Sequence, residues 1–83
     1  MHASEIRARR VAMGLTQAEL AQRLGTTSNT VARWERGERA PEHPGMLRIM
    51  LQHIDDELMA DPVWREERNR RMRAQMENEL QEG

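Results

Sequence analysis

The sequence contains no cysteine, lysine, phenylalanine or tyrosine. Without cysteine it can have neither a disulfide framework nor a thiolate metal site, which fits an intracellular protein. Its 83 residues make one small domain, whose core must rest on Leu, Ile, Val, Met and Trp. No apolar run approaches the roughly 20 residues that a membrane helix needs, and the first residues lack the apolar region of a signal peptide. We therefore expect a soluble, cytoplasmic protein without membrane contacts.

The residue patterns of common active sites are missing as well. The three histidines, His2, His43 and His53, are scattered and lack the spacing of metal ligands. There is no Gly-rich phosphate loop, and the pair Asp55–Asp56 resembles an acidic helix end more than two catalytic carboxylates. We expect no enzymatic activity, no catalytic residue, no metal and no cofactor.

All thirteen basic residues are arginine, and the charges are unevenly distributed. Residues 1–40 hold seven arginines and four glutamates, whereas residues 41–83 hold six arginines and ten acidic residues. The net charge of −1 therefore combines a basic first half with an acidic second half. This division suits a protein that contacts nucleic acid on one side only.

Two helix starts and two glycines predict where the helices of the basic half begin and end. Thr16 and Glu19 have the spacing of a capping box, in which each side chain binds an otherwise unpaired amide at a helix start. Gly14 before this start suits the left-handed end of a preceding helix. Gly25 ends the helix that begins at Thr16, so a short helix, a turn and another helix are predicted.

The helix after this turn, which Thr27 or Ser28 can cap, has two unlike faces. Val31 and Trp34 share the side that we expect to pack inward. The opposite side begins with small hydrogen-bonding residues and ends with arginines: Ser28, Asn29, Ala32, Arg33 and Arg36. Asparagine can bind adenine and arginine can bind guanine through two hydrogen bonds each. Most polar helix faces are simply solvated, but this one lacks the Glu–Arg pairs found elsewhere in the chain, and it predicts the recognition of DNA bases.

Sixteen positions between residues 15 and 41 follow one known pattern: Leu15, Thr16, Gln17, Glu19, Leu20, Ala21, Leu24, Gly25, Thr27, Thr30, Val31, Trp34, Glu35, Gly37, Arg39 and Pro41. Through them the chain resembles the Cro/CI-type helix-turn-helix family, the XRE class with the lambda-repressor-like fold. The stretch QAELAQRLGTT is especially similar to phage repressors, and residues 6–13 supply the usual first helix. A match of this length in fixed register is far more specific than a short motif.

This resemblance implies an all-α, compact five-helix domain with its helix-turn-helix at residues 16–36. It also implies which residues contact double-stranded DNA. The residues expected to reach base edges are Ser28, Asn29 and Arg33, of which Ser28 is the least secure because it is short. The residues expected to contact phosphates are Gln17, Thr27, Thr30, Arg36 and Arg39, and Gln17 is also expected to brace the recognition helix. Phosphate contacts set the register on DNA, whereas base contacts specify its sequence.

An ion pair is expected beneath the recognition helix. Arg10 falls on the same face of the first helix as Ile6 and Met13, and a buried guanidinium needs a partner. Glu35 lies on the inner side of the third helix, and the resembled family commonly has an ion pair at these two positions. We predict the pair Arg10–Glu35; the alternative is that Arg10 extends outward to a phosphate.

A fourth helix is predicted from residues 43–45 onward, with Pro44 in its first turn, where the missing amide costs nothing. Its apolar residues recur at spacings of three and four: Met46, Leu47, Met50, Leu51, Ile54 and Leu58. This stripe is longer than a four-helix domain requires, so we expect its later part, at Ile54 and Leu58, to contact a second protomer. The acidic end of the helix should face away from DNA.

Asp61 and Pro62 predict the cap and first residue of a fifth helix. This helix is mostly charged, and its sparse apolar stripe includes Trp64, Met72 and Met76. We divide the chain into a DNA-binding domain, residues 1–60, and a C-terminal helix, residues 61–83. The helix is expected to serve in dimerisation or self-packing, to bind another protein, or to form a loosely attached tail.

These features favour a sequence-specific transcriptional repressor that binds an inverted-repeat operator as a homodimer and regulates its own operon. One helix-turn-helix covers only a few base pairs, and twofold dimers are the commonest assembly. The expected dimer or partner residues are Ile54, Leu58, Trp64, Met72 and Met76. The alternative is an antitoxin or adaptor whose C-terminal helix binds a protein partner, with DNA binding secondary. A regulator from a phage or mobile element is a third possibility.

Overall fold

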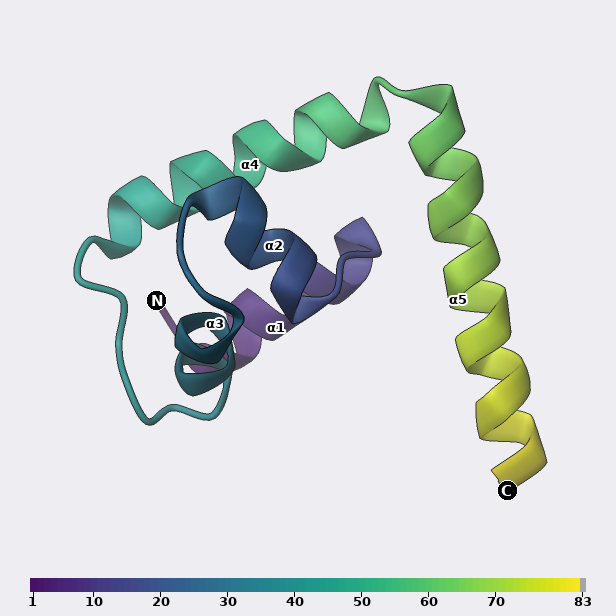
Figure 1. Cartoon of the computed structure of the whole chain (residues 1–83), viewed down its shortest axis with the longest axis horizontal. Helices are drawn as coiled ribbons and strands as arrows, with labels where there is room; N and C mark the ends of the chain where they lie inside the picture. Colours follow the sequence, from purple (N-terminus) through teal and green to yellow (C-terminus); the bar gives the residue numbers. More distant parts are fainter. Residues whose placement is uncertain (83) are drawn as a thin grey trace.

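Five helices make up most of the chain (Figure 1). The computed structural model describes residues 1–82, with the side chains of residues 1–78. The helices are α1 (Ala3–Met13), α2 (Gln17–Leu24), α3 (Ser28–Glu35), α4 (Pro44–Met59) and α5 (Pro62–Glu82). No strand occurs in residues 1–82, and the predicted all-α, five-helix fold is confirmed. None of the helices in this range is long and apolar enough to cross a membrane. Residue 83, the last of the predicted C-terminal segment, lies outside the described residues.

Local hydrogen bonds fix where three of the helices begin. The Glu19 amide donates to the Thr16 hydroxyl at 3.1 Å, and the Thr16 amide donates to the Glu19 carboxylate at 2.9 Å, which completes the predicted capping box. Thr27 caps α3 by accepting a bond from the Thr30 amide at 3.2 Å. Asp61 accepts a bond at 3.0 Å from an amide in the first turn of α5. Because these bonds satisfy amides that a helix start leaves unpaired, they define the boundaries of α2, α3 and α5.

The core lies where α1–α4 meet, with α4 running along one side of the other three (Figure 1). Its buried members are Ile6, Met13, Leu15, Leu20, Ala21, Val31, Leu47, Leu51, Ile54 and Leu58. Trp34 and Trp64 are partly buried against them. Each large apolar side chain that leaves water contributes roughly 1.5–3 kcal/mol to folding. Trp34 is therefore a packing residue, as predicted.

Ile54 and Leu58 belong to this core, and the prediction that they form a dimer or partner surface is wrong. Only 5% and 4% of their surfaces are exposed. The sequence marks α4 as apolar on more than one side, and spacing alone does not say which side enters the core. The exposed apolar residues of α4 are Met46 and Ile49, at 63% and 71%.

A largely buried ion pair joins α1 to the end of α3. Arg10 donates from Nε and Nη2 to the two oxygens of Glu35 at 2.7 and 2.8 Å, and from Nη1 to the Leu15 carbonyl oxygen at 3.0 Å. Gln17, at the start of α2, donates to Glu35 Oε1 at 3.3 Å. Burial by itself raises the pKa of Glu35, but the hydrogen bonds from Arg10 and Gln17 outweigh it and hold this pKa below its ordinary value. The predicted pair is present, and three helices meet at its carboxylate.

Polar contacts hold α5 against the turn between α1 and α2. Arg71 donates to both carboxylate oxygens of Glu19, at 2.6 and 3.2 Å, and to the Gly14 carbonyl oxygen at 3.0 Å. Its guanidinium carbon lies 4.9 Å from the centre of the Trp64 ring, a cation–π distance. The Trp64 indole donates to the Met13 carbonyl oxygen at 3.0 Å. These contacts pack α5 on its own protomer, which is one of the roles expected for this helix.

Gly14 is required at this turn for two reasons. Its φ of +76° lies in the left-handed region, where a side chain is strained. A Cβ atom at this position would also lie 2.7 Å from Cγ of Arg68, on α5. The glycine thus both ends α1 and leaves room for the C-terminal helix.

The Arg10–Glu35 pair predicts a large effect of removing one partner. The Arg10 side chain is 14% exposed, so Glu35→Ala leaves a mostly buried cation without a counter-ion. We expect the free energy of unfolding to fall by about 3–5 kcal/mol, measured by urea denaturation followed by circular dichroism. The double variant Arg10→Met/Glu35→Leu buries no charge and should recover most of the loss. A loss below about 1 kcal/mol for Glu35→Ala, typical of an exposed pair, would contradict this role.

The Glu19–Arg71 pair predicts a dependence of stability on pH. Hydrogen bonds from Arg71 lower the pKa of Glu19 from 4.5 to about 2, against the opposing effect of burial. The pair therefore stabilises the fold fully above pH 4.5, and this contribution disappears as the pH falls toward 2. Glu19→Gln keeps a capping-box acceptor and should be less stable than the natural chain at pH 7, by at most about 1 kcal/mol because both side chains are 35% exposed.

Urea unfolding of the two proteins at several pH values tests this expectation, and their stabilities should converge at the acid end. Glu66→Gln, which changes an exposed carboxylate on α5, is the matched control and should follow the natural chain throughout. A difference between Glu19→Gln and the natural chain that stays constant from pH 7 to pH 2 would refute the coupling.

Candidate nucleic-acid interface

The helix α3 is held by one side and exposes the other. Val31 is completely buried, and Trp34 packs against the core. Ser28 and Asn29, in the first turn, are exposed, and 44% of the Arg33 side chain is accessible. Asn29 and Arg33 are four residues apart and so lie on the same side of the helix. The residues predicted to reach base edges thus lie on an accessible surface with rigid support.

The start of α3 is organised by two threonines. The hydroxyl oxygens of Thr27 and Thr30 lie 2.9 Å apart and share a hydrogen bond. Thr27 is exposed and Thr30 is half-buried. Amides at a helix start carry positive partial charge, which favours an anion nearby. Both threonines therefore lie at the helix end that favours an anion.

Gln17, the third predicted phosphate contact, is the first residue of α2 and is half-buried. One N–H of its side-chain amide is directed to Glu35. Since the amide group carries two N–H bonds, the other can serve a phosphate. The same side chain can thus brace α3 and contact DNA.

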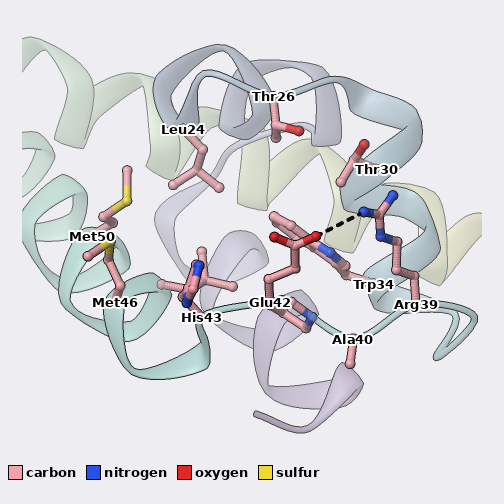
Figure 2. A pocket seen from close by; sticks show the side chains of 12 residues that line it. Leu24, Thr26, Thr30, Trp34, Arg39, Ala40, Glu42, His43, Met46 and Met50 are labelled. Atoms are coloured by element: carbon pink, nitrogen blue, oxygen red, sulfur yellow. Dashed lines mark ion pairs between the residues drawn. The ribbon is translucent and has the colours of Figure 1, made fainter.

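Acidic residues lie beside the arginines at the end of α3, so the expectation that this face lacks Glu–Arg pairs is wrong for its last turn. Arg36 donates to both oxygens of Glu38, at 2.8 and 3.1 Å. Glu38 also lies 4.0 Å from Arg33, and Arg39 lies 3.6 Å from Glu42 (Figure 2). The hydrogen bonds from Arg36 lower the pKa of Glu38, and those to Glu38 raise the pKa of Arg36. Each of the three arginines therefore faces a carboxylate of its own chain.

An open hollow of about 460 Å³ lies between α3 and the start of α4 (Figure 2). Its apolar lining includes Leu24, Trp34, Met46 and Met50. Figure 2 shows Thr30 and Arg39 at the side opposite the two methionines. The hollow is therefore lined on one side by Thr30 and Arg39, two predicted phosphate contacts, and on the other by Met46 and Met50 of α4.

Comparison with known proteins bears on the same residues. A family model described as Helix-turn-helix matches residues 6–42, which extend from α1 through α3 and the loop that follows it. No curated protein and no solved structure matches the chain. Residues 6–42, which include those that cap α2 and bury Val31, thus form a helix-turn-helix of the Cro/CI type, the DNA-binding unit of transcription regulators.

Proposed function

We propose that this regulator is a sequence-specific repressor that binds an inverted-repeat operator as a homodimer and controls its own operon. The observation that carries the proposal is the outer face of α3, where Asn29 and Arg33 are accessible while Val31 is locked in the core. Side chains of these two types can each form two hydrogen bonds with one base. Base recognition needs such side chains on a rigid element, because a loosely held side chain loses its geometric selectivity.

Contacts with the DNA backbone come from both ends of the recognition helix and from α2. Thr27, Thr30 and Gln17 approach phosphates from the start of α3 and α2, whereas Arg36 and Arg39 approach from beyond the end of α3. On binding, Arg36 and Arg39 exchange their carboxylate partners for phosphates. Because the exchanged ion pairs are already formed in the free protein, the net gain in electrostatic energy is small, and non-specific affinity is modest.

A dimer increases both affinity and specificity. Two protomers related by a twofold axis contact two half-sites about 10 base pairs apart on one face of the duplex. Occupation of such a site within a promoter blocks access by RNA polymerase, which is the simplest route to repression. An operator next to its own gene makes the protein limit its own synthesis.

A role as antitoxin or adaptor has less support, because α5 is already engaged. Trp64 and Arg71 contact the protomer's own α1–α2 turn, so a protein partner would have to displace them. Met72 is half-buried. Among the predicted partner residues of α5, Met76 is the most accessible, at 62%.

The operator prediction is tested on DNA from immediately upstream of the gene. A footprint should show a protected inverted repeat whose half-site centres lie about one helical turn apart. Affinity for this site should exceed that for a shuffled sequence by about 10³-fold or more at physiological salt. Equal affinity for both DNAs would reject sequence-specific repression at this site.

Two arginine variants separate base recognition from backbone contact. Arg33→Ala should cost about 1–3 kcal/mol on the operator and relax the preference at one base position. Arg39→Ala should weaken all sequences alike and reduce the slope of log affinity against log salt by about 1. Both are measured by fluorescence anisotropy on operator and shuffled DNA across a salt series.

The control is Arg65→Ala, which removes an exposed arginine from the first part of α5 and should leave both affinities unchanged. Equal losses for Arg33→Ala on operator and shuffled DNA would show that Arg33 contacts the backbone and does not recognise a base.

A further inference from the structure

The helix α4 has a second apolar face, beside the one that enters the core. Met46, Ile49 and Met50 form it at spacings of three and four residues. Met46 and Ile49 are 63% and 71% exposed, and Met50 is half-buried. Within the described residues no segment covers Ile49. Clustered apolar side chains at the surface of a small protein mark an interaction surface.

Two hollows border this face. One is the hollow of about 460 Å³ beside α3, in which Figure 2 shows Met46 and Met50 on the α4 side. The other, of about 350 Å³, is lined by Ile49, Met50, His53 and Arg23 among others. Because Met50 lines both, the two hollows adjoin along α4, and we call them together the α4 groove. A helix with protruding apolar side chains can pack into a groove of this kind.

Charge along α4 is divided between its two ends. The first half carries one arginine, Arg48, and no acidic residue, and the N-cap residue His43 makes no side-chain capping bond. The second half carries three acidic residues, Asp55, Asp56 and Glu57. The helix dipole adds positive partial charge at the first end and negative partial charge at the second, so these carboxylates stand at the unfavourable end. An antiparallel copy of α4 places each acidic end beside the uncapped, positive end of the other helix.

We propose that the α4 groove binds a second copy of this chain, with the two α4 helices antiparallel and the twofold axis passing between Ile49 and Met50. In this register Met46 of one protomer lies opposite His53 of the other, and His43 lies opposite Asp56. The apolar residues are then buried at the centre. Arg48 is already paired with Glu5 of α1 at 3.3 Å, so at both ends the carboxylates of one helix meet the positive end of the other helix's dipole. A surface that is complementary to itself in this way fits an isologous dimer better than an unrelated partner.

This inference specifies the surface of the dimer and rests on the proposed function for the expectation that a dimer exists. It replaces Ile54 and Leu58, which are buried, with residues of the same helix that point outward. The exposed stripe and the divided charge are properties of the free chain, so the test requires no DNA.

Sedimentation velocity of the full chain is the first test. The natural protein should sediment as a dimer at micromolar concentration, and Ile49→Glu should raise the dimer dissociation constant by roughly 30-fold or more, since a charge at the centre of an interface removes its main contact. The matched control is Val63→Glu, which changes an apolar residue of α5 that is 76% exposed and should leave the dimer intact. Thermal unfolding of both variants verifies that the protomer remains folded.

Cysteine cross-linking is the second test. Because the sequence has no natural cysteine, a disulfide can form only between the introduced cysteines. Ile49→Cys lies beside the proposed axis, so mild oxidation should yield a disulfide-linked dimer on a non-reducing gel. Val63→Cys should remain monomeric under the same conditions.

Three results would overturn the proposal. A natural chain that is monomeric in solution would show that the α4 groove does not bind a second copy in the free protein. Dissociation by Val63→Glu but not by Ile49→Glu would move the interface to α5, and failure of Ile49→Cys to cross-link would exclude the antiparallel register. A protein that dimerises but fails to bind the operator would reject the proposed function and would not affect the proposed interface. A monomer that binds the operator would reject the interface and would not affect the proposed recognition of DNA.

Discussion

The carboxylate of Glu35 is the point at which three helices are joined. Arg10 reaches it from α1, Gln17 reaches it from α2, and Glu35 itself is the last residue of α3. Apolar burial of Val31 holds α3 to the core but is non-directional, so it tolerates small rotations of the helix. A guanidinium–carboxylate pair with two parallel hydrogen bonds has a defined geometry. The rotation of α3, and with it the direction of Asn29 and Arg33, depends on this pair.

The same chemistry attaches the C-terminal helix. Glu19 accepts hydrogen bonds both from the Thr16 amide and from Arg71, so the residue that caps α2 also anchors α5. The first turn of α2 is therefore held from two sides, by Gln17 toward the core and by Arg71 from outside. Because this turn is expected to contact a phosphate, α5 supports the expected DNA-binding surface through Arg71. A helix as charged as α5 would be marginal alone, and its order depends on these contacts.

Local signals explain how much of the fold the sequence could predict. The capping box at Thr16 and the glycine at position 14 act over a few residues, so their geometry depends little on the rest of the chain. The Arg10–Glu35 pair could also be predicted, since a cation on an apolar helix face requires a buried partner. The orientation of α4 could not, because its apolar residues form two overlapping stripes and only tertiary packing selects one.

The Glu19–Arg71 pair was beyond prediction for a different reason. Its members are 52 positions apart, and a charged residue on an exposed helix has many potential partners. The pairing of Arg36 with Glu38 did leave a signal, because arginine and glutamate alternate closely in the segment RWERGERAPE. Of the acidic residues in this segment, Glu35 has a predicted partner in Arg10, whereas the motif gives no role to Glu38 and Glu42.

Those acidic residues bear on how the regulator distinguishes one DNA sequence from another. Glu38 lies between Arg33 and Arg36, and in the free protein it neutralises charge on both. If Arg33 recognises a base and Arg36 binds a phosphate as proposed, binding leaves Glu38 near the negatively charged backbone without either partner. On the correct sequence two new hydrogen bonds to a base offset this cost. On an incorrect sequence nothing offsets it, so Glu38 adds a repulsive contribution that weakens non-specific binding more than specific binding.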